Sequence, residues 1–379
     1  MTPPLAGLRL LDLSRQLPGP FCSTILADLG MDVLVVAAPN DPFGLGIPFL
    51  ARNKRSMTLD LKRPEGRAIF HRLAADADVL LEGFRPGVAA RLGVDHATLS
   101  ATNPRLVYCA ISGYGQDGPY RDRVGHDANY LGYAGVLATI GAADGPPIIP
   151  GVQIADLAGG ALTAAVGILA AIVARAATGH GQMVDVAMLD GSFALNVYHA
   201  LLAHLEGRAP ARGRTPLTGR FACYAVYETR DGRHLTIAAY EPHFWAALCR
   251  RFGRPDLIPL QWAEGPERDA TLAFFRAAFR ERTLEEWRRE LADAEICFGP
   301  VNTVEEAFDD PQLRHRGMVV ELATPTGAMR FPGPPIKLSD TPASVRTPPP
   351  TFGADTDAVL ASLGYDAAAI AALRAAGVV

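Results

Sequence analysis

Short apolar segments alternate with amphipathic segments over residues 8–111 of the chain. The apolar segments predict β-strands and the amphipathic segments predict helices. The predicted strands cover 8–13, 33–36, 78–82 and 106–111, and the predicted helices cover 21–29, 64–75 and 88–92. This alternation is typical of a doubly wound, Rossmann-like α/β domain. A Pro/Gly loop at 16–20 follows the first strand, and ligands bind at the carboxyl ends of parallel strands.

The later part of the chain has a different pattern. A long apolar segment predicts a helix over 157–174, and a strand over 182–186 and a helix over 187–205 follow it. An Asp-Gly turn at 231–232 predicts a hairpin, and helices are predicted at 242–252, 266–280 and 283–294. We therefore predict a large α/β domain that binds the ligand, a Gly/Pro/Arg-rich linker, a smaller α+β domain, and a Pro-rich return segment that packs on the large domain. These parts cover 1–206, 207–222, 223–325 and 326–379.

The segment 157–174 carries no charge and is long enough to raise the question of a membrane span. It is dominated by Ala and Gly, and Asp156 and Arg175 flank it directly. These features favour a buried or subunit-packing helix, and we expect no membrane partner.

Composition narrows the class of protein. A length of 379 residues with 49% hydrophobic and 20% charged residues is typical of a folded chain with two domains or one elaborated domain. The net charge of −4 argues against binding of nucleic acid. Five cysteines without paired spacing favour reduced thiols, and the N-terminus lacks a basic, apolar leader. We therefore expect a cytoplasmic protein.

Several known motifs are absent or incomplete. The segment 113–118 matches GxGxxG after a predicted strand, but 119–123 opens no helix on which a pyrophosphate would bind. A glycine-rich turn that shapes a pocket explains it better. The chain has no GxSxG, P-loop or HExxH motif, and we expect neither a metal nor a redox cofactor.

A basic run, Arg52-Asn53-Lys54-Arg55, precedes a β-like segment. It is interpreted either as a solvated loop or as a phosphate clamp, because Arg and Lys donors match phosphate oxygens. Arg85 lies at the end of a predicted strand, where ligands bind.

Three titratable residues are candidates for proton transfer: His126 in GHDANY, Asp156 at the start of the long apolar segment, and Glu241 in EPHF. A carboxylate in apolar surroundings near a histidine has a proton affinity tuned toward neutrality. Each residue also has a structural explanation, as a core histidine, a helix cap or a helix-start carboxylate. The functional hypothesis depends on the three together.

This joint pattern resembles the family III CoA-transferase superfamily, and within it the alpha-methylacyl-CoA racemase branch. The resemblance covers nearly the whole chain. It is carried by the segments at 5–8, 18–20, 27–33, 52–55, 82–87, 112–119, 179–185 and 299–303. Transferases of the superfamily use the aspartate that matches Asp156 as a nucleophile, and they usually lack the His and Glu of the two other motifs. The presence of His126 and Glu241 favours the racemase.

The resemblance implies a racemase of 2-methyl-branched acyl-CoA thioesters in fatty acid metabolism. Glu241 would act on one face of the α-carbon and His126, supported by Asp156, on the other, with backbone N–H groups near Asp127 stabilising the enolate. It also implies an intertwined homodimer in which Glu241 reaches the site of the other subunit. The alternatives are a CoA-transferase that forms a CoA thioester at Asp156, and a CoA-binding paralogue without catalysis.

The implied binding residues follow from the same resemblance, and no cofactor beyond the CoA thioester is implied. The CoA-binding residues would be Pro18, Arg52, Lys54, Arg55, Gly83 and Arg85, and the acyl pocket would contain Tyr130, Phe221 and Tyr224. Two departures from the family pattern are present. Bulky Phe221 intrudes on a glycine-rich stretch and would narrow or reshape the acyl pocket. A basic residue that is usual near Ala38 is missing.

Overall fold

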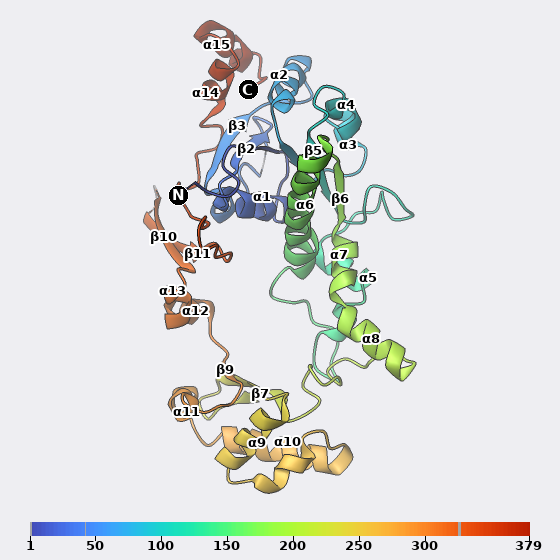
Figure 1. The fold of residues 1–379 in the computed structure, drawn as a ribbon, viewed down its shortest axis with the longest axis vertical. Helices are drawn as coiled ribbons and strands as arrows, with labels where there is room; N and C mark the ends of the chain where they lie inside the picture. The colour runs from blue at the N-terminus through green and yellow to red at the C-terminus, as the bar shows by residue number, and fades with distance from the viewer. Residues whose placement is uncertain (1, 42, 325–326) are drawn as a thin grey trace. The chain divides into compact units, whose positions relative to one another are not determined.

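The computed structural model describes residues 2–41, 43–324 and 327–379, and these form two compact units (Figure 1). Unit 1 contains Met1–Val136, Pro150–Val197 and Pro311–Val379, and unit 2 contains Leu137–Ile149 and Tyr198–Asp310. The chain therefore leaves unit 2 after Asp310 and returns to unit 1 at Pro311. The predicted domain boundary between residues 325 and 326 lies outside the described residues.

Unit 1 is built on a six-stranded sheet in which every strand pair is parallel. The strand order is β3-β2-β1-β4-β5-β6. The strands are β1 (Arg9–Asp12), β2 (Asp32–Ala37), β3 (Lys54–Thr58), β4 (Val79–Glu82), β5 (Val107–Ser112) and β6 (Met183–Ala187). The chain direction across the sheet reverses between β1 and β4, which is the place where open parallel sheets bind ligands. The predicted α/β class with a parallel sheet is confirmed.

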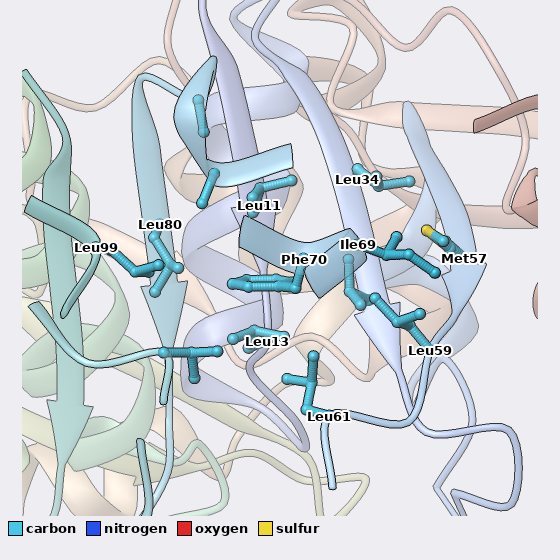
Figure 2. Close-up of a cluster of buried hydrophobic side chains, with 14 of the residues drawn as sticks. Leu11, Leu13, Leu34, Met57, Leu59, Leu61, Ile69, Phe70, Leu80 and Leu99 are labelled. Atoms are coloured by element: carbon cyan, nitrogen blue, oxygen red, sulfur yellow. The ribbon is translucent and has the colours of Figure 1, made fainter. Parts of the chain in front are cut away.

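The two faces of this sheet are covered by different helices. On one face, α1 (Pro18–Asp28) packs against the strands and against α6 (Thr163–Thr178). The other face is covered by α2 (Pro64–Ala75), α4 (His96–Ser100), α14 (Thr356–Ser362) and α15 (Ala367–Ala375). A continuous apolar core fills this second interface, with Phe70 of α2 against Leu11 and Leu80 of the sheet (Figure 2). The short helix α3 (Val88–Leu92) and the 3₁₀ turn η1 (Pro48–Ala51) complete this part of the chain.

The long apolar helix begins as a π-helix, η3 (Ala155–Leu162), and continues as α6. Together they form 24 residues that are long and apolar enough to cross a membrane by length and composition, a criterion that core helices of soluble proteins also meet. The α6 helix buries Ala164, Ile168 and Ala171 as it packs on β5 and β6. Other apolar residues of η3 and α6, such as Leu162, Val166 and Val173, are exposed.

The predicted helix over 187–205 is two helices, α7 (Met188–Leu195) and α8 (Val197–Glu206). Asn196 ends α7, and its side-chain amide donates a 3.3 Å hydrogen bond to the Ala134 carbonyl. Asn favours helix ends because its short polar side chain competes for backbone partners. The α7 helix also passes so close to η3 that a Cβ on Gly191 would lie 2.2 Å from the Gly159 carbonyl oxygen.

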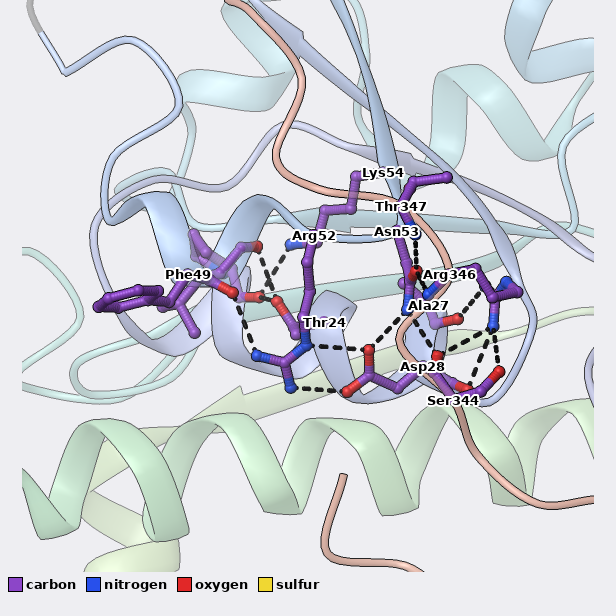
Figure 3. Close-up of polar contacts among 12 residues, drawn as sticks. Thr24, Ala27, Asp28, Phe49, Arg52, Asn53, Lys54, Ser344, Arg346 and Thr347 are labelled. Atoms are coloured by element: carbon purple, nitrogen blue, oxygen red, sulfur yellow. Dashed lines mark hydrogen bonds and ion pairs between the residues drawn. The ribbon is translucent and has the colours of Figure 1, made fainter. Parts of the chain in front are cut away.

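The last part of unit 1 contains α13 (Pro311–His315) and an antiparallel pair, β10 (Val319–Thr324) and β11 (Gly327–Pro332), that the sequence analysis did not predict. The chain then runs along α1. Asn53 donates its amide to Asp28 and to the Ser344 carbonyl, and its side-chain oxygen accepts the N–H groups of Arg346 and Thr347 (Figure 3). These contacts fix the Pro-rich segment to the large sheet.

Unit 2 combines a three-stranded antiparallel sheet with helices. Its strands are β7 (Tyr224–Glu228), β8 (His234–Ala238) and β9 (Phe298–Pro300). Its helices and turns are η2 (Leu137–Thr139), α9 (Pro242–Arg251), η4 (Pro255–Leu260), α10 (Gly265–Phe279), α11 (Leu284–Leu291) and α12 (Val304–Asp309). An aromatic core that includes Tyr227, Trp245 and Phe275 packs these elements together.

Candidate active site

A cleft of about 710 Å³ opens in unit 1 beyond the carboxyl ends of β1, β4 and β5. Five segments line it: the loop after β1 with the start of α1, the loop after β4, the segment that follows β5, η3, and the start of α7. His126 and Asp156 both line this cleft. Two of the three predicted proton-transfer residues therefore lie at one site.

His126 is the N-cap residue of α5 (Asp127–Tyr133) and has an exposed side chain. Its extended backbone ends the segment after β5, and its N–H donates to the Asn129 side-chain oxygen at 3.0 Å. This capping contact fixes the backbone from which the imidazole projects into the cleft.

Asp127 connects the histidine to the π-helix. Its buried carboxylate accepts hydrogen bonds from the backbone N–H groups of Ala155, at 2.7 Å, and Asp156, at 3.1 Å. The Asp127 carboxylate therefore anchors the first residues of η3. Because the backbone N–H of Asp156 is one of the two donors, this contact also fixes the position of Asp156.

Asp156 is half-buried, at the first turn of η3. Burial and then the neighbouring Asp127 carboxylate raise the pKa of Asp156 to about 6, while His126 lowers it. Burial disfavours the charged carboxylate, and a second negative charge adds to this effect. A carboxyl group with this pKa can exchange a proton near neutral pH.

Aromatic packing fixes the segment that carries His126. Tyr130 lines the cleft, and its hydroxyl donates a hydrogen bond to the Gly125 carbonyl. A Cβ on Gly113 would lie 2.5 Å from the Tyr130 ring, so only glycine fits there. Tyr114 packs edge-on against Tyr130 with ring centroids 5.2 Å apart. The GxGxxG segment thus shapes this pocket, and residues 119–126 form no helix.

Two further carboxylates hold the other loops of the cleft, and the sequence analysis did not identify their roles. Glu82, at the end of β4, accepts the Phe84 N–H at 2.6 Å, and burial raises the pKa of Glu82 to about 7. Asp185 on β6 accepts the Gln116 N–H at 3.1 Å. Both residues pair across the sheet with Ala110 of β5. A polar residue that ends a buried strand was the available signal for Glu82.

The residues predicted to bind CoA do not all lie in one place. Pro18, Gly83 and Arg85 line the cleft with His126 and Asp156. Arg52, Lys54 and Arg55 do not line it within the described part of the chain.

These three cations have other partners. Arg52 is buried and forms a two-pronged ion pair with Asp28, with contacts of 3.1 and 2.7 Å (Figure 3). Arg55 pairs with Asp32 on the neighbouring strand, where both side chains are exposed. Lys54 is buried beside α1. The basic run is therefore neither a solvated loop nor one cluster of unpaired charges.

A smaller hollow of about 70 Å³ adjoins the cleft at the carboxyl end of β2. Ala38 lines it together with Lys62, Arg15 and Phe84, and the last two residues also line the cleft. Lys62 and Arg15 bring cationic groups to the hollow beside Ala38, near which this chain lacks the basic residue that is usual in the family pattern.

Glu241 belongs to unit 2. It is the exposed N-cap residue of α9, where the positive end of the helix dipole favours a carboxylate. Of the predicted acyl-pocket residues, Tyr130 lines the cleft of unit 1. Phe221 and Tyr224 lie in the apolar core of unit 2, where Phe221 packs edge-on against Trp262 at 5.1 Å.

Within residues 2–41, 43–324 and 327–379, no three His, Cys, Asp or Glu side chains gather closely enough to hold a metal ion.

Comparison with known proteins identifies the family. A model of CoA-transferase family III matches residues 5–356. Human alpha-methylacyl-CoA racemase is 36% identical over 95% of this chain and 94% of its own length. Human succinyl-CoA:glutarate CoA-transferase is 32% identical over 99% of this chain and 90% of its own length. The crystal structure of a CAIB/BAIF family protein from Brucella suis is 32% identical and superposes with a TM-score of 0.83, covering 96% of this chain and all of that one. The sequence identities to the racemase and to the transferase are too similar to distinguish the two activities.

Proposed function

Because this chain belongs to CoA-transferase family III, we propose that it racemises acyl-CoA thioesters that carry a methyl branch on the α-carbon. The observation that carries this proposal is the shared cleft of His126 and Asp156, in which the carboxyl group has a pKa of about 6. A transferase needs only the carboxylate as a nucleophile. A histidine beside a carboxyl group that titrates near neutral pH suits proton transfer.

The proposed reaction moves protons at one carbon. His126, assisted by Asp156, accepts the α-proton as the C–H bond breaks, and the electron pair delocalises onto the thioester oxygen as an enolate. The protonated carboxyl of Glu241 donates its proton to the opposite face, which forms the new C–H bond with inverted configuration. The reverse direction exchanges these roles. Each positioned acid or base contributes about 10²–10⁴-fold, and N–H groups near Asp127 stabilise the enolate oxygen.

We propose that the active form is a homodimer in which Glu241 of the partner subunit completes the cleft. Large apolar side chains on η3, α6 and α7 are exposed in the single chain, namely Leu162, Val166, Val173, Phe193 and Leu195. An exposed apolar surface of this kind marks an interface between proteins. Light scattering in solution tests the expected mass of two chains.

The CoA moiety would extend from the hollow beside Ala38 to the cleft. Arg15 and Lys62 would bind phosphate oxygens at the hollow, and Arg85 would do so at the mouth of the cleft. The proposed chemistry needs no cofactor beyond the CoA thioester.

Solvent exchange tests the racemase directly. Incubation of one enantiomer of a 2-methyl-branched acyl-CoA in D₂O gives the opposite enantiomer with deuterium on the α-carbon, and Glu241→Gln abolishes this inversion because one face loses its acid. Glu305→Gln removes another exposed glutamate from the first turn of a helix in unit 2 and leaves inversion unchanged. Inversion at the wild-type rate in Glu241→Gln would remove Glu241 from the mechanism.

The accessible carboxyl of Asp156 supports a second candidate, a CoA-transferase. Its carboxylate would attack the thioester, release the CoA thiolate and form an acyl anhydride. The thiolate would then attack the aspartyl carbonyl of the anhydride, which forms an aspartyl thioester and releases the donor carboxylate. The acceptor carboxylate would attack that thioester and form a second anhydride, and the released thiolate would attack its acceptor carbonyl, which gives the new acyl-CoA and frees Asp156. Mixing the protein with an acyl-CoA and a free carboxylate distinguishes the candidates. New acyl-CoA, with hydroxylamine trapping at Asp156, establishes the transferase, and α-deuteration without acyl exchange establishes the racemase. CoA binding without either reaction establishes a non-catalytic paralogue.

A further inference from the structure

Lys54 is a buried cation for which the proposed reaction has no role. The side chains of Lys54 and Asp12 are each 1% exposed, and the Lys54 amino nitrogen lies 3.9 Å from an Asp12 carboxylate oxygen. The chain contains three lysines among its 36 basic residues. A chain that otherwise uses arginine therefore has a compact ammonium group at this buried position.

The ammonium group of Lys54 connects the sheet to the start of α1. It donates a 2.9 Å hydrogen bond to the Pro20 carbonyl and a 2.7 Å hydrogen bond to the Ser23 hydroxyl. Ser23 in turn donates its hydroxyl to Asp12, at the end of β1. Figure 3 shows Lys54 beside α1, next to the Arg52–Asp28 pair.

The same contacts continue to the surface of the cleft. The carboxylate of Asp12 accepts both the N–H, at 2.8 Å, and the hydroxyl of Ser14. A Cβ on Gly19 would lie 2.1 Å from the Ser14 Cβ, so Ser14 packs directly on Gly19, and it also packs against Gly83. Gly19 and Gly83 both line the cleft. We call Asp12, Ser14, Ser23 and Lys54 the Asp12–Lys54 network.

The loop that this network encloses has an unfavourable backbone conformation. Gln16 lines the cleft and has φ of 65°, a left-handed conformation that residues with a side chain rarely adopt. Such a conformation persists only where the surrounding contacts hold it, and it is concentrated at functional sites. The Asp12–Lys54 network is attached at both ends of this loop, through Ser14 and Pro20.

Stability alone does not explain a buried pair of this kind. Removing two charges from water costs about as much as their attraction returns, and apolar replacements of buried pairs are often neutral or stabilising. A buried network that fixes the geometry of a loop at a binding site is explained by its effect on binding.

We propose that Lys54 is a positioning residue, which holds the loop after β1 and the Pro18–Gly19 edge of the cleft in the geometry that binds the CoA thioester. The proposal rests on the proposed function, because it concerns the same cleft. Lys54 touches no substrate and acts through Ser23, Pro20 and Asp12.

The network predicts a pH dependence. Lys54 faces Asp12 on β1, Cys22 and Asp28 on α1, and Arg52 on its own segment. Burial lowers the pKa of Lys54 to about 8, against the opposing effect of Asp12. Above this pH the hydrogen bonds of Lys54 lose their charge assistance, and charge-assisted bonds are about twice as strong as neutral ones. The KM of the wild-type protein for acyl-CoA should therefore rise above pH 8.

The test compares Lys54→Met with the wild type in steady-state kinetics on a 2-methyl-branched acyl-CoA between pH 6.5 and 9.5. Lys54→Met should raise KM about tenfold and change kcat by less than about threefold, because misplacement of a binding loop weakens productive binding. Its KM should be flat across pH 8. An unchanged KM, or a pH dependence equal to that of the wild type, would overturn the proposal.

Arg175→Met is the matched control. Arg175 is another buried cation of unit 1, paired with Asp78 at 2.9 Å, and it does not line the cleft within the described residues. It should lower the Tm and leave KM unchanged. An equal rise of KM in both variants would show a general loss of stability and would overturn the positioning role.

Ser23→Ala provides a second variant in case Lys54→Met does not fold, because Ala is well tolerated in a helix. It removes the hydroxyl between Lys54 and Asp12 and should raise KM about threefold, by loss of charge-assisted bonds. A folded Ser23→Ala protein with the wild-type KM contradicts the proposal.

Calorimetric titration with free CoA separates the two proposals. A wild-type protein that does not bind CoA overturns the proposed function and with it the positioning role. A wild-type protein that binds CoA, with Lys54→Met binding it equally at every pH, overturns the positioning role alone.

Discussion

The two faces of the large sheet are built from different chemistry, and strand β1 shows both. Leu11 points into the apolar core shared with α2, where Phe70 and Leu80 are its neighbours (Figure 2). Asp12, the next residue, points to the other face, where the Asp12–Lys54 network connects it to α1. Neighbouring residues of one strand therefore serve packing on one face and the geometry of the cleft on the other.

This difference suggests a division of roles. Apolar burial contributes stability in proportion to the area removed from water, and it depends little on direction. Hydrogen bonds and ion pairs contribute less net stability, but they fix distances and angles. We therefore expect changes on the α1 face to affect activity more than stability, and changes on the α2 face to do the reverse.

The largest expected effect is on the α1 face, at Asp156 of η3. Asp156→Asn keeps the shape of the side chain but cannot assist His126 or act as a nucleophile, so kcat/KM should fall by about 10³-fold or more. Both candidate reactions share this outcome. Initial rates of α-deuteration and of acyl exchange, measured over a range of acyl-CoA concentrations, give kcat/KM for each candidate reaction.

The same variant should be more stable than the wild type at neutral pH. The pKa of Asp156 is raised in the folded state, so the folded protein binds more protons than the unfolded chain between about pH 4 and 6. The free energy of unfolding therefore falls as pH rises through this window. Asp156→Asn removes the free-energy cost of holding an ionised carboxylate at this site in the folded protein. This cost is about 1 kcal/mol after allowance for the partial exposure of the carboxyl. Urea unfolding should show the gain at pH 7 and lose it at pH 4. A variant that is active, or less stable at pH 7, contradicts the division of roles.

The second prediction concerns the α2 face. Phe70→Ala empties the centre of the apolar core, where Phe70 is fully buried, and should lower the free energy of unfolding by about 3–5 kcal/mol. Because no atom of Phe70 lines the cleft in the described structure, KM of the folded variant should stay at the wild-type value. Denaturant titration and kinetics at 20 °C on the same preparation check both parts. A stable variant with a raised KM would contradict the proposed division of roles between the two faces of the sheet.

The same contrast explains what the sequence could predict. Apolar periodicity identified the strands and helices of the sheet, since β1 and β4 fall within the predicted segments, β5 extends one residue beyond its predicted segment, and α2 matches its prediction at both ends. The predicted helix over 187–205 was wrong as a single element, because Asn196 ends α7. The pair β10–β11 was missed although Met329 and Phe331 of β11 are more buried than their exposed neighbours, because this alternation covers few residues next to a Pro-rich segment.

The site was predictable only in part. Motif resemblance located His126 and Asp156, which the structure brings to one cleft. The face of the sheet to which each side chain of the basic run at 52–55 points could not be predicted from the sequence. Lys54 points to the α1 face, and Arg55, the next residue, points to Asp32 at the opposite side of the strand. Alternation along a strand separates neighbouring charges, so a run of cations in sequence need not be a cluster in space.

The smallest expected effect also lies on the α1 face, at Asp127. Activity should rise with pH through about 6 as Asp156 ionises. Asp127→Asn keeps an oxygen that accepts the N–H groups of Ala155 and Asp156 but removes a negative charge, so the pKa of Asp156 should fall and the acidic limb of kcat/KM should move to lower pH. Asp122→Asn removes an exposed carboxylate from the segment before His126 and should leave the limb in place. If Asp127→Asn lowers the plateau without moving the limb, the residue acts through structure alone. If the acidic limb of the kcat/KM profile moves and the Tm is unchanged, the negative charge of Asp127 changes the pKa of Asp156 without contributing to the stability of the fold.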